Sequence, residues 1–311
     1  MTPIFGFLFP GQGSQSVGMG KPLFDSSSAI QALYKEATDI LGYDVGGLCF
    51  DGPLEQLNRT EYTQPALLVT SLAAFQLVND GPLKPAAVAG HSLGEYTALV
   101  AAGALGFREA VNLVQKRGNY MAEAVVPGSG LVAAILGLSE ADVRSACQEA
   151  ATVGIVAPAN FNSPGQTVIA GEKAAVERAA ELAKIRGAKK VKSLPVSVPV
   201  HTPLMQVAAD RLKKDIDSLQ WSDLKVPLVN NVDAKILYSA EEVRGSLVRQ
   251  LPSPVRWQET IQAMSQMGIT HFVEIGPGKV LTGLVKRIVP EAITWNVMDQ
   301  ESYAHVLSHC S

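Results

Sequence analysis

Residues 86–102 read AAVAGHSLGEYTALVAA, two short apolar runs on either side of a glycine-flanked serine. Within them, Gly90-His91-Ser92-Leu93-Gly94 fits the Gly-x-Ser-x-Gly pattern, which occurs where a buried strand turns sharply into a helix. The glycines allow close backbone packing, and the serine hydroxyl is left exposed at the carboxyl end of the sheet. We therefore predict a strand over Ala86–Ala89, a helix over Glu95–Ala102 and a nucleophile at Ser92. A chance match to a short motif is the alternative, and the strand and helix patterns around the serine disfavour it.

Similar alternation of apolar runs and helical patterns is found toward both ends of the chain. The continuous apolar run Ile4–Phe9 is typical of a strand buried on both faces of a parallel sheet. His271–Ile275 is a second such strand, and a helix over Lys279–Ile288 follows it. A long helix over Ala66–Val78 is expected to begin at Pro65, since proline is favoured in a first helical turn. This order predicts an α/β fold with a mostly parallel sheet and helices on both faces.

The middle of the chain follows a different pattern. Residues 127–198 start with a Pro-Gly-Ser-Gly stretch and end in a proline-rich stretch. The predicted elements between them are the strand Leu131–Leu136, the helix Ser139–Ala150, the strands Gly154–Ala159 and Gln166–Ala170, the helix Glu172–Ile185 and the strand Lys189–Leu194. This βαββαβ order is the ferredoxin-like pattern. We therefore predict a small ferredoxin-like domain at 127–198, inserted into a large domain formed by 1–126 and 199–311.

A serine nucleophile requires a base that accepts its proton. His201 follows the proline-rich stretch, where the chain re-enters the large domain and an interdomain cleft is expected. We assign the base to His201, with a purely structural histidine as the alternative. The other histidines are His91, His271, His305 and His309. The first should point away from its neighbour Ser92, the second opens a predicted strand, and the last two lie in a C-terminal tail with no motif. No acidic residue stands out as a third member, so we expect a neutral group to orient the histidine.

A glycine-rich loop, Pro10-Gly11-Gln12-Gly13-Ser14-Gln15, follows the first predicted strand. The dinucleotide-binding Gly-x-Gly-x-x-Gly pattern fails because Ser16 occupies the third glycine position, and the phosphate-binding P-loop pattern is missing as well. We expect the loop to bring the backbone N–H of Gln12 toward Ser92. The N–H of Leu93, at the start of the helix, is the other expected donor to an oxyanion.

Arg117 lies on the apolar stripe of a predicted helix, with Leu113, Val114, Tyr120 and Met121 around it. Most arginines are surface residues, which is the alternative for this one. A buried guanidinium requires an anionic partner. If the protein supplies no carboxylate, a carboxylate on the substrate is the expected partner.

Composition excludes several classes of protein. The chain has 311 residues, 47% of them hydrophobic, and a formal net charge of −3, so no overall positive field would recruit nucleic acid. Its three cysteines are Cys49, Cys147 and Cys310; they form no Cys-x-x-Cys pair, which argues against a cysteine metal site and favours a reducing compartment. No apolar run approaches the length of a membrane span. We expect a cytoplasmic protein that binds neither nucleic acid nor membrane.

The motifs in combination resemble the malonyl-CoA:acyl carrier protein transacylase family, from about the first strand to Arg287. The residues that carry the resemblance are Gly11-Gln12-Gly13-Ser14-Gln15, Thr63-Gln64-Pro65-Ala66, Gly90-His91-Ser92-Leu93-Gly94-Glu95, Arg117, Asn162-Ser163-Pro164-Gly165-Gln166, His201 and Gly276-Pro277-Gly278-Lys279. The resemblance implies an α/β-hydrolase-like domain that carries a ferredoxin-like insert. It implies acyl transfer from a coenzyme A thioester to an acyl carrier protein by a ping-pong mechanism in fatty acid biosynthesis, with no metal or redox cofactor.

The resemblance also implies individual roles. Ser92 would be the nucleophile and His201 its base, with oxyanion contacts from Gln12 and Leu93. Arg117 would hold the malonyl carboxylate, and Asn162 would lie at the edge of the cleft. A main-chain carbonyl near Gln250 would orient the histidine.

Three alternatives remain open. The run Val198-Pro199-Val200-His201 matches neither His-Ala-Phe-His nor Tyr-Ala-Ser-His, the motifs that report extender choice in polyketide-synthase relatives, and is similar to the discrete bacterial fatty-acid enzymes. A polyketide-pathway acyltransferase with another carrier or extender is the first alternative. A serine hydrolase, either a thioesterase or an esterase, shares the serine motif but has no need of a buried cation. A non-catalytic docking subunit would not require both Ser92 and His201.

Overall fold

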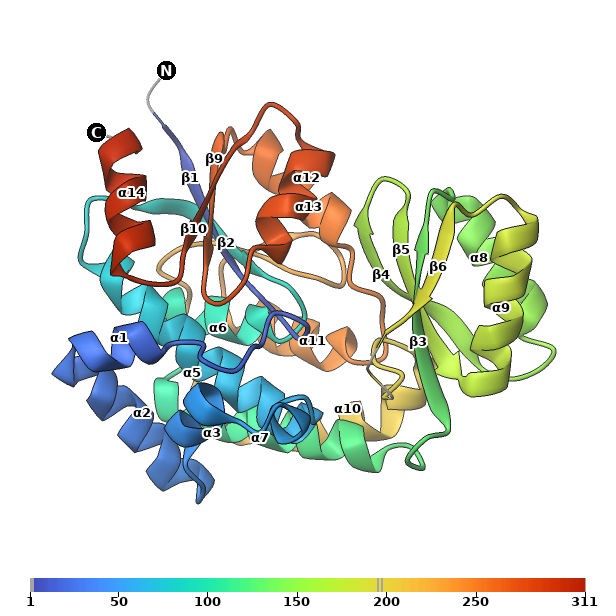
Figure 1. The fold of residues 1–311 in the computed structure, drawn as a ribbon, viewed down its shortest axis with the longest axis horizontal. Coiled ribbons are helices and arrows are strands. Elements are labelled where there is room, and N and C mark those ends of the chain that lie inside the picture. The colour runs from blue at the N-terminus through green and yellow to red at the C-terminus, as the bar shows by residue number, and fades with distance from the viewer. Residues whose placement is uncertain (1–2, 195, 197, 311) are drawn as a thin grey trace.

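The computed structural model describes residues 3–194, 196 and 198–310, and its strands form two separate sheets (Figure 1). The strands are β1 (Phe5–Phe9), β2 (Pro85–Gly90), β3 (Gly130–Leu136), β4 (Val156–Ser163), β5 (Gln166–Glu172), β6 (Lys190–Ser193), β7 (Leu228–Val229), β8 (Ile236–Leu237), β9 (His271–Ile275) and β10 (Ile293–Val297). The α-helices are α1 (Lys21–Ser26), α2 (Ser28–Leu41), α3 (Val45–Asp51), α4 (Leu54–Leu57), α5 (Thr60–Asn79), α6 (Gly94–Ala101), α7 (Phe107–Glu123), α8 (Glu140–Ala150), α9 (Lys173–Ile185), α10 (Gln206–Ser218), α11 (Ala240–Gln250), α12 (Trp257–Gln266), α13 (Val280–Ile288) and α14 (Gln300–Cys310).

The larger sheet has the strand order β10-β9-β1-β2-β7-β8 and is parallel except for β8. Side chains of β1 alternate between its two faces: Phe5, Phe7 and Phe9 pack among helices that include α5 and α7, whereas Leu8 packs against α12 and α13. Helices therefore cover both faces of the sheet (Figure 1). The predicted α/β fold with a mostly parallel sheet is confirmed, because buried apolar strands of this kind need cover on both sides.

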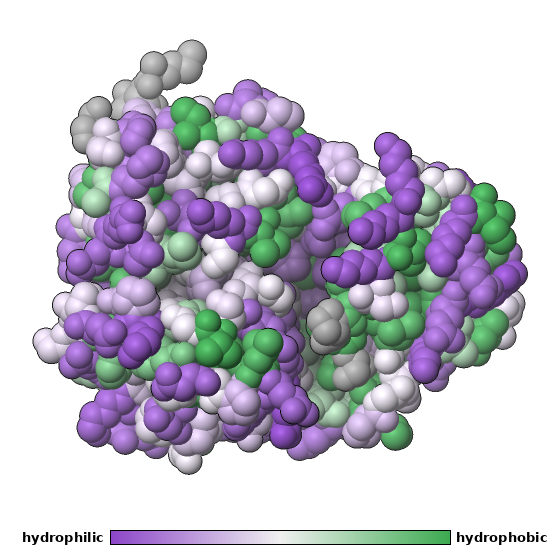
Figure 2. All heavy atoms as spheres, in the orientation of Figure 1, coloured by the Kyte–Doolittle hydropathy of each residue, from purple (hydrophilic) through white to green (hydrophobic). Residues whose placement is uncertain are grey.

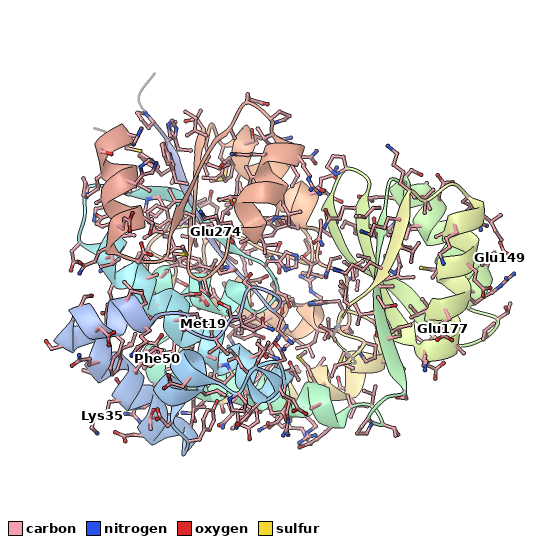
Figure 3. All side chains as sticks on the ribbon, in the orientation of Figure 1. Met19, Lys35, Phe50, Glu149, Glu177 and Glu274 are labelled. Atoms are coloured by element: carbon pink, nitrogen blue, oxygen red, sulfur yellow. The ribbon has the colours of Figure 1, made fainter. Side chains whose placement is uncertain are left out.

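The smaller sheet is antiparallel, with the order β4-β5-β3-β6. Helices α8 and α9 pack on one face, burying Val143, Val176 and Ala179 against it. Both helices also carry exposed carboxylates, Glu149 on α8 at the outer edge of the molecule and Glu177 on α9 (Figure 3). The opposite face, with Val132 and Val168, is turned toward the larger sheet and its helices.

Strand β4 joins the two parts of the molecule through its backbone. Phe161 N–H donates to the carbonyl of Val255 at 2.8 Å, and Val255 N–H donates to the carbonyl of Ala159 at 2.8 Å. The strand runs to Ser163, four residues beyond its predicted end at Ala159, because this contact and the pairing with β5 extend it.

The predicted start of the long apolar helix is also wrong. Helix α5 begins at Thr60, five residues before Pro65, so the proline lies inside the helix. The chain is already helical before the proline, because the N–H of Thr63 donates to the carbonyl of Arg59 at 2.8 Å. Among the described residues, no helix is both long enough and apolar enough to cross a membrane.

The turn between β2 and α6 packs against β1 with no space for side chains at its glycines. A Cβ on Gly90 would lie 1.9 Å from the carbonyl carbon of Gly94, and one on Gly94 would lie 2.0 Å from the carbonyl oxygen of Phe9. Both clashes involve backbone atoms, in the first residue of α6 and the last residue of β1, which cannot move without shifting the helix or the strand. The close approach of turn and strand therefore depends on glycine at both positions.

We expect Gly94→Ala to lower the free energy of unfolding by about 1–3 kcal/mol or more, because the methyl group meets backbone. Thermal unfolding followed by circular dichroism measures this. Gly245→Ala is the matched control: Gly245 is exposed in the middle of α11 with open space around it. It should raise stability by up to about 1 kcal/mol, the difference in helix propensity. Equal effects of the two substitutions would contradict the packing argument.

Candidate active site

Ser92 occupies the turn between β2 and α6 in a left-handed backbone conformation, with φ 52°. Such a conformation is rare and costly for a non-glycine residue. It is held by Asn231, whose Oδ1 accepts from the Ser92 N–H at 2.7 Å and whose Nδ2 donates to the carbonyl of Gly90 at 2.7 Å. The Ser92 hydroxyl lies 2.7 Å from Nε2 of His201. The structure therefore brings the predicted nucleophile and the predicted base into direct contact.

His201 is buried and also lies in a left-handed conformation, with φ 60°. Its Nδ1 lies 2.9 Å from the main-chain carbonyl of Gln250. A carbonyl only accepts, so Nδ1 carries the proton and Nε2 presents its lone pair to Ser92. The orienting group is thus neutral, at the residue for which the sequence led us to expect it.

Burial and the nearby charge of Arg117 lower the pKa of His201 to about 3, from a usual value of 6.5. Burial disfavours the charged imidazolium, and the guanidinium repels it. The histidine is therefore neutral at physiological pH, which is the form that accepts a proton from a hydroxyl.

Two backbone N–H groups near the serine have no acceptor in the part of the chain that the structure describes. Leu93 is buried immediately before α6, and Gln12 lies in the turn after β1. Among the described residues, no protein atom accepts from the N–H of either residue. The side chain of Gln12 is engaged, since its Oε1 accepts from Thr60 Oγ1 at 2.9 Å. Unpaired donors beside a nucleophile are suited to an oxyanion.

Arg117 is 1% exposed, on α7. Its Nη1 donates to Gln64 Oε1 at 2.7 Å, and its Nη2 lies 3.1 Å from both Ser92 Oγ and Gln250 Oε1. The guanidinium also lies over the ring of Tyr96, 5.3 Å from its centre. The residue predicted from an apolar helix stripe thus reaches the nucleophile itself.

Asn162, on β4, comes to the site from the smaller sheet. Its Oδ1 lies 2.9 Å from Nε2 of His91, whose ring stacks at an angle on Trp257. His91 is thus engaged by Asn162 and Trp257 rather than by Ser92, and it lines the same cavity as Ser92. Asn162 contacts the turn rather than the nucleophile.

Sequence reasoning missed three residues of the site: Gln64, Glu95 and Asn231. Gln64 and Glu95 stand within motifs that carry the family resemblance, but no role was assigned to either. Both are polar residues inside apolar helices, which is the signal that would have pointed to them. Asn231 follows a short buried strand, and nothing in its sequence context indicates its contact with Ser92.

A cavity of about 90 Å³ opens onto Ser92 and His201. Gln12 and His91 line it from the larger body, and Val132, Val168 and Leu194 line it from the smaller sheet. It lies at the hollow between the two bodies in Figure 2. The site is therefore built from both sheets.

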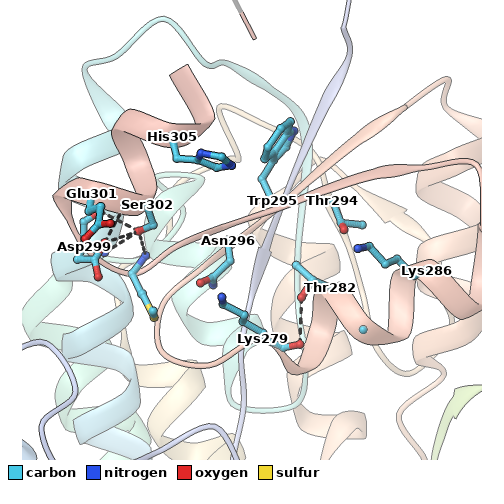
Figure 4. Close-up of a pocket in the computed structure, with 12 residues that line it drawn as sticks. Lys279, Thr282, Lys286, Thr294, Trp295, Asn296, Asp299, Glu301, Ser302 and His305 are labelled. Atoms are coloured by element: carbon cyan, nitrogen blue, oxygen red, sulfur yellow. Dashed lines mark hydrogen bonds between the residues drawn. The ribbon is translucent and has the colours of Figure 1, made fainter. Parts of the chain in front are cut away.

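A larger cavity, of about 710 Å³, lies elsewhere, between α13, β10 and α14 (Figure 4). Lys279 and Lys286 line one side of it, and Trp295 and His305 line the other. It contains none of the residues around Ser92. Within the described part of the chain, no cluster of His, Cys, Asp or Glu side chains is placed to hold a metal ion.

Comparison with known proteins defines first the class and then the family. The sequence profile of the acyl transferase domain matches residues 6–306, which makes the chain an acyl transferase. It is 49% identical to the malonyl CoA-acyl carrier protein transacylase of Escherichia coli K12 over 299 residues, which cover 96% of each chain. The chain belongs to the malonyl CoA-acyl carrier protein transacylase family, and the resemblance noted in the sequence is confirmed.

Other relatives agree. The chain is 46% identical to the transacylase of the same name from Bacillus subtilis 168 over 297 residues, covering 95% of this chain and 94% of the relative. The acyl carrier protein S-malonyltransferase of Vibrio cholerae superposes with a TM-score of 0.94 at 48% identity, covering 97% of this chain and 99% of the other. A malonyl-transacylase solved in complex with a type II PKS acyl-carrier protein superposes with a TM-score of 0.96 at 48% identity, covering 98% and 99%.

The low pKa of His201 predicts an unusual titration. Between the usual histidine pKa of 6.5 and a pH of about 3, the ring should stay neutral and bound to Ser92. Histidine ¹⁵N NMR measured as the pH falls reports the charge of the ring directly. In Arg117→Ala the pKa of His201 should rise, because the substitution removes a positive charge that disfavours protonation. A wild-type His201 that takes up its proton near 6.5 would contradict the burial argument.

Proposed function

We propose that this chain transfers a malonyl group from malonyl-CoA to the phosphopantetheine thiol of an acyl carrier protein in fatty acid biosynthesis. The observation that carries the proposal is a nucleophile–base pair beside a buried guanidinium that has no carboxylate partner among the described residues. The names of the relatives support the same reaction. The solved complex of a relative with an acyl-carrier protein supports the choice of partner.

The reaction has two half-reactions. In the first, His201 Nε2 takes the proton of Ser92, Oγ attacks the thioester carbonyl, and the C–S bond breaks. His201 then returns the proton to the departing coenzyme A thiolate. In the second, His201 takes the proton of the carrier thiol, sulfur attacks the serine ester, and Ser92 recovers its proton. The Gln12 and Leu93 N–H groups would stabilise the oxyanion in both.

Specificity for malonyl would come from Arg117, because a planar carboxylate accepts two parallel hydrogen bonds from a guanidinium. Asn162 would shape the cleft edge through His91. No metal or redox cofactor is needed for this chemistry. The three unpaired cysteines suit a reducing, cytoplasmic setting.

The architecture fits this function. We assign residues 1–126 and 199–311 to an α/β-hydrolase-like domain, which supplies Ser92 and His201 at the edge of its parallel sheet. Residues 127–198 form a ferredoxin-like insert, whose apolar face closes the cleft. The order β4-β5-β3-β6 and the βαββαβ succession support the insert assignment.

A polyketide-pathway carrier is the second candidate partner. The observation that favours it is the relative solved with a type II PKS acyl-carrier protein, at 48% identity. The chemistry at Ser92 is the same for either carrier.

Incubation with malonyl-CoA should place a malonyl ester on Ser92, detected by intact mass and peptide mapping. Ser92→Ala should abolish the mass shift, because Ser92 is the one hydroxyl among the described residues that is hydrogen-bonded to the His201 ring. Ser163→Ala is the matched control: Ser163 is a buried serine with no hydrogen-bond partner for its hydroxyl, and its removal should leave acylation intact. Acylation of another residue would contradict the mechanism, and steady release of free malonate without carrier would favour a hydrolase.

Arg117→Ala should transfer malonyl groups much more slowly than the wild type. Its rate of acetyl transfer should rise relative to its rate of malonyl transfer. Stranding a buried carboxylate costs about 3–5 kcal/mol, or roughly 10²–10³ in rate. The measurement is the ratio of kcat/KM for malonyl-CoA to that for acetyl-CoA. Arg117→Lys should give an intermediate ratio, since an ammonium group restores the positive charge but not the two parallel N–H donors of a guanidinium. An unchanged ratio in Arg117→Ala would assign Arg117 to the fold alone.

A further inference from the structure

Arg117 is a buried cation whose hydrogen bonds to the described residues all go to neutral groups. Its hydrogen bonds go to the carboxamide oxygens of Gln64 and Gln250 and to the hydroxyl of Ser92. In the part of the chain that the structure describes, no carboxylate forms an ion pair with it. Buried charges are ordinarily paired with a group of opposite charge. The guanidinium of Arg117 can therefore still bind an anion.

A carboxyl group is nevertheless close by. Glu95, on α6, is 1% exposed, and its Oε2 accepts from Gln250 Nε2 at 3.0 Å and from the backbone N–H of Asn231 at 3.0 Å. Gln250 Oε1 accepts from Arg117 Nη2 at 3.1 Å. The carboxamide of Gln250 therefore lies between the acid and the guanidinium, with its NH₂ toward one and its oxygen toward the other.

The orientation of this carboxamide is fixed on several sides. Besides Glu95, its Nε2 donates to the carbonyl of Ser92 at 3.1 Å. A flipped amide would point its NH₂ at the guanidinium and its oxygen at the two acceptors, losing all three hydrogen bonds. The main-chain carbonyl of the same residue holds His201 at 2.9 Å, so the position of its backbone is fixed as well.

The raised pKa of Glu95 agrees with the separation of its carboxyl group from the guanidinium of Arg117. Burial raises the pKa of Glu95 to about 7, even though hydrogen bonds and the charge of Arg117 act to lower it. A carboxylate in direct contact with a guanidinium ordinarily has a lowered pKa. The raised value is the one expected when a neutral group stands between the two.

We propose that Gln250 is a specificity-determining and positioning residue, whose carboxamide keeps Glu95 out of an ion pair with Arg117. The guanidinium is held in place by neutral acceptors, Gln64 and Gln250, and its charge stays available to the carboxylate of the acyl group. A resident carboxylate at either position would satisfy Arg117 in the free enzyme and repel the anionic acyl group. This inference rests on the proposed function, in which Arg117 binds that carboxylate.

The test moves a carboxylate onto Arg117 at each of the two neutral positions. Gln250→Glu places it beside Nη2, and Gln64→Glu places it beside Nη1, on α5 and away from the contacts of Ser92 and His201. Each should lower the malonyl-to-acetyl ratio of kcat/KM by about a hundredfold. The ratio is taken within one variant, so general damage to Ser92 or His201 affects both substrates alike and cancels.

Glu95→Gln is the matched control. Its amide oxygen can still accept from Gln250 and Asn231, and no carboxylate is brought nearer to Arg117, so the malonyl-to-acetyl ratio should not fall. Thermal unfolding of all variants checks that they are folded. The inference is wrong if Gln64→Glu or Gln250→Glu folds and keeps the wild-type malonyl-to-acetyl ratio of kcat/KM. It is also wrong if Glu95→Gln lowers that ratio.

Arg117→Ala in the same assay separates this failure from that of the proposed function. One outcome is that Arg117→Ala lowers the malonyl-to-acetyl ratio of kcat/KM while both glutamate variants keep the wild-type ratio. In that case Arg117 binds the substrate carboxylate, and the proposed role of Gln250 is rejected. If Arg117→Ala also keeps the ratio, the proposed role of Arg117 itself is rejected.

Discussion

Backbone contact between the Ser92 turn and strand β1 is the constraint on which the rest of the site depends. The N–H of His91 donates to the carbonyl of Phe9 at 3.0 Å, and a Cβ on Gly11 would lie 2.2 Å from the carbonyl oxygen of His91. Glycine on both sides of the contact lets two loops from adjacent parallel strands approach at backbone distance. As a result, the loop that holds Gln12 lies beside the turn that holds Ser92 and Leu93.

This packing stores strain where the chemistry takes place. Ser92 and His201 both have positive φ, and each such residue costs on the order of 1–3 kcal/mol. Hydrogen bonds from elsewhere in the larger body hold both residues: Asn231 holds the backbone of Ser92, and the carbonyl of Gln250 holds the ring of His201. The fold thus fixes both partners of the 2.7 Å Ser92–His201 contact before any substrate arrives.

Burial then sets the charges. The same removal from water keeps His201 neutral, raises the pKa of Glu95 and leaves Arg117 without solvent to satisfy it. Gln250 touches all of these groups and Ser92 besides, through its main chain for the histidine and through its side chain for the others. A single neutral residue therefore couples the geometry of the base to the electrostatics of the guanidinium.

Local features of the fold could be predicted from the amino-acid sequence alone. Gly90-His91-Ser92-Leu93-Gly94 indicated a strand, a turn and a helix because the short-range sterics of that turn demand those residues. The apolar stripe around Arg117 indicated its burial, because apolar residues that recur at helical spacing lie on one face of the helix. The predicted start of α5 was wrong, since proline is tolerated inside a helix that neighbouring residues have already begun.

The pairing of groups that lie far apart in the chain could not be predicted, because it depends on the tertiary structure. Asn231 is 139 residues from Ser92, and Glu95 is 155 residues from Gln250. No local pattern encodes such pairs, because they arise from how β2, β7 and α11 pack together, and the separation of Glu95 from Arg117 by one carboxamide exists only once they have packed.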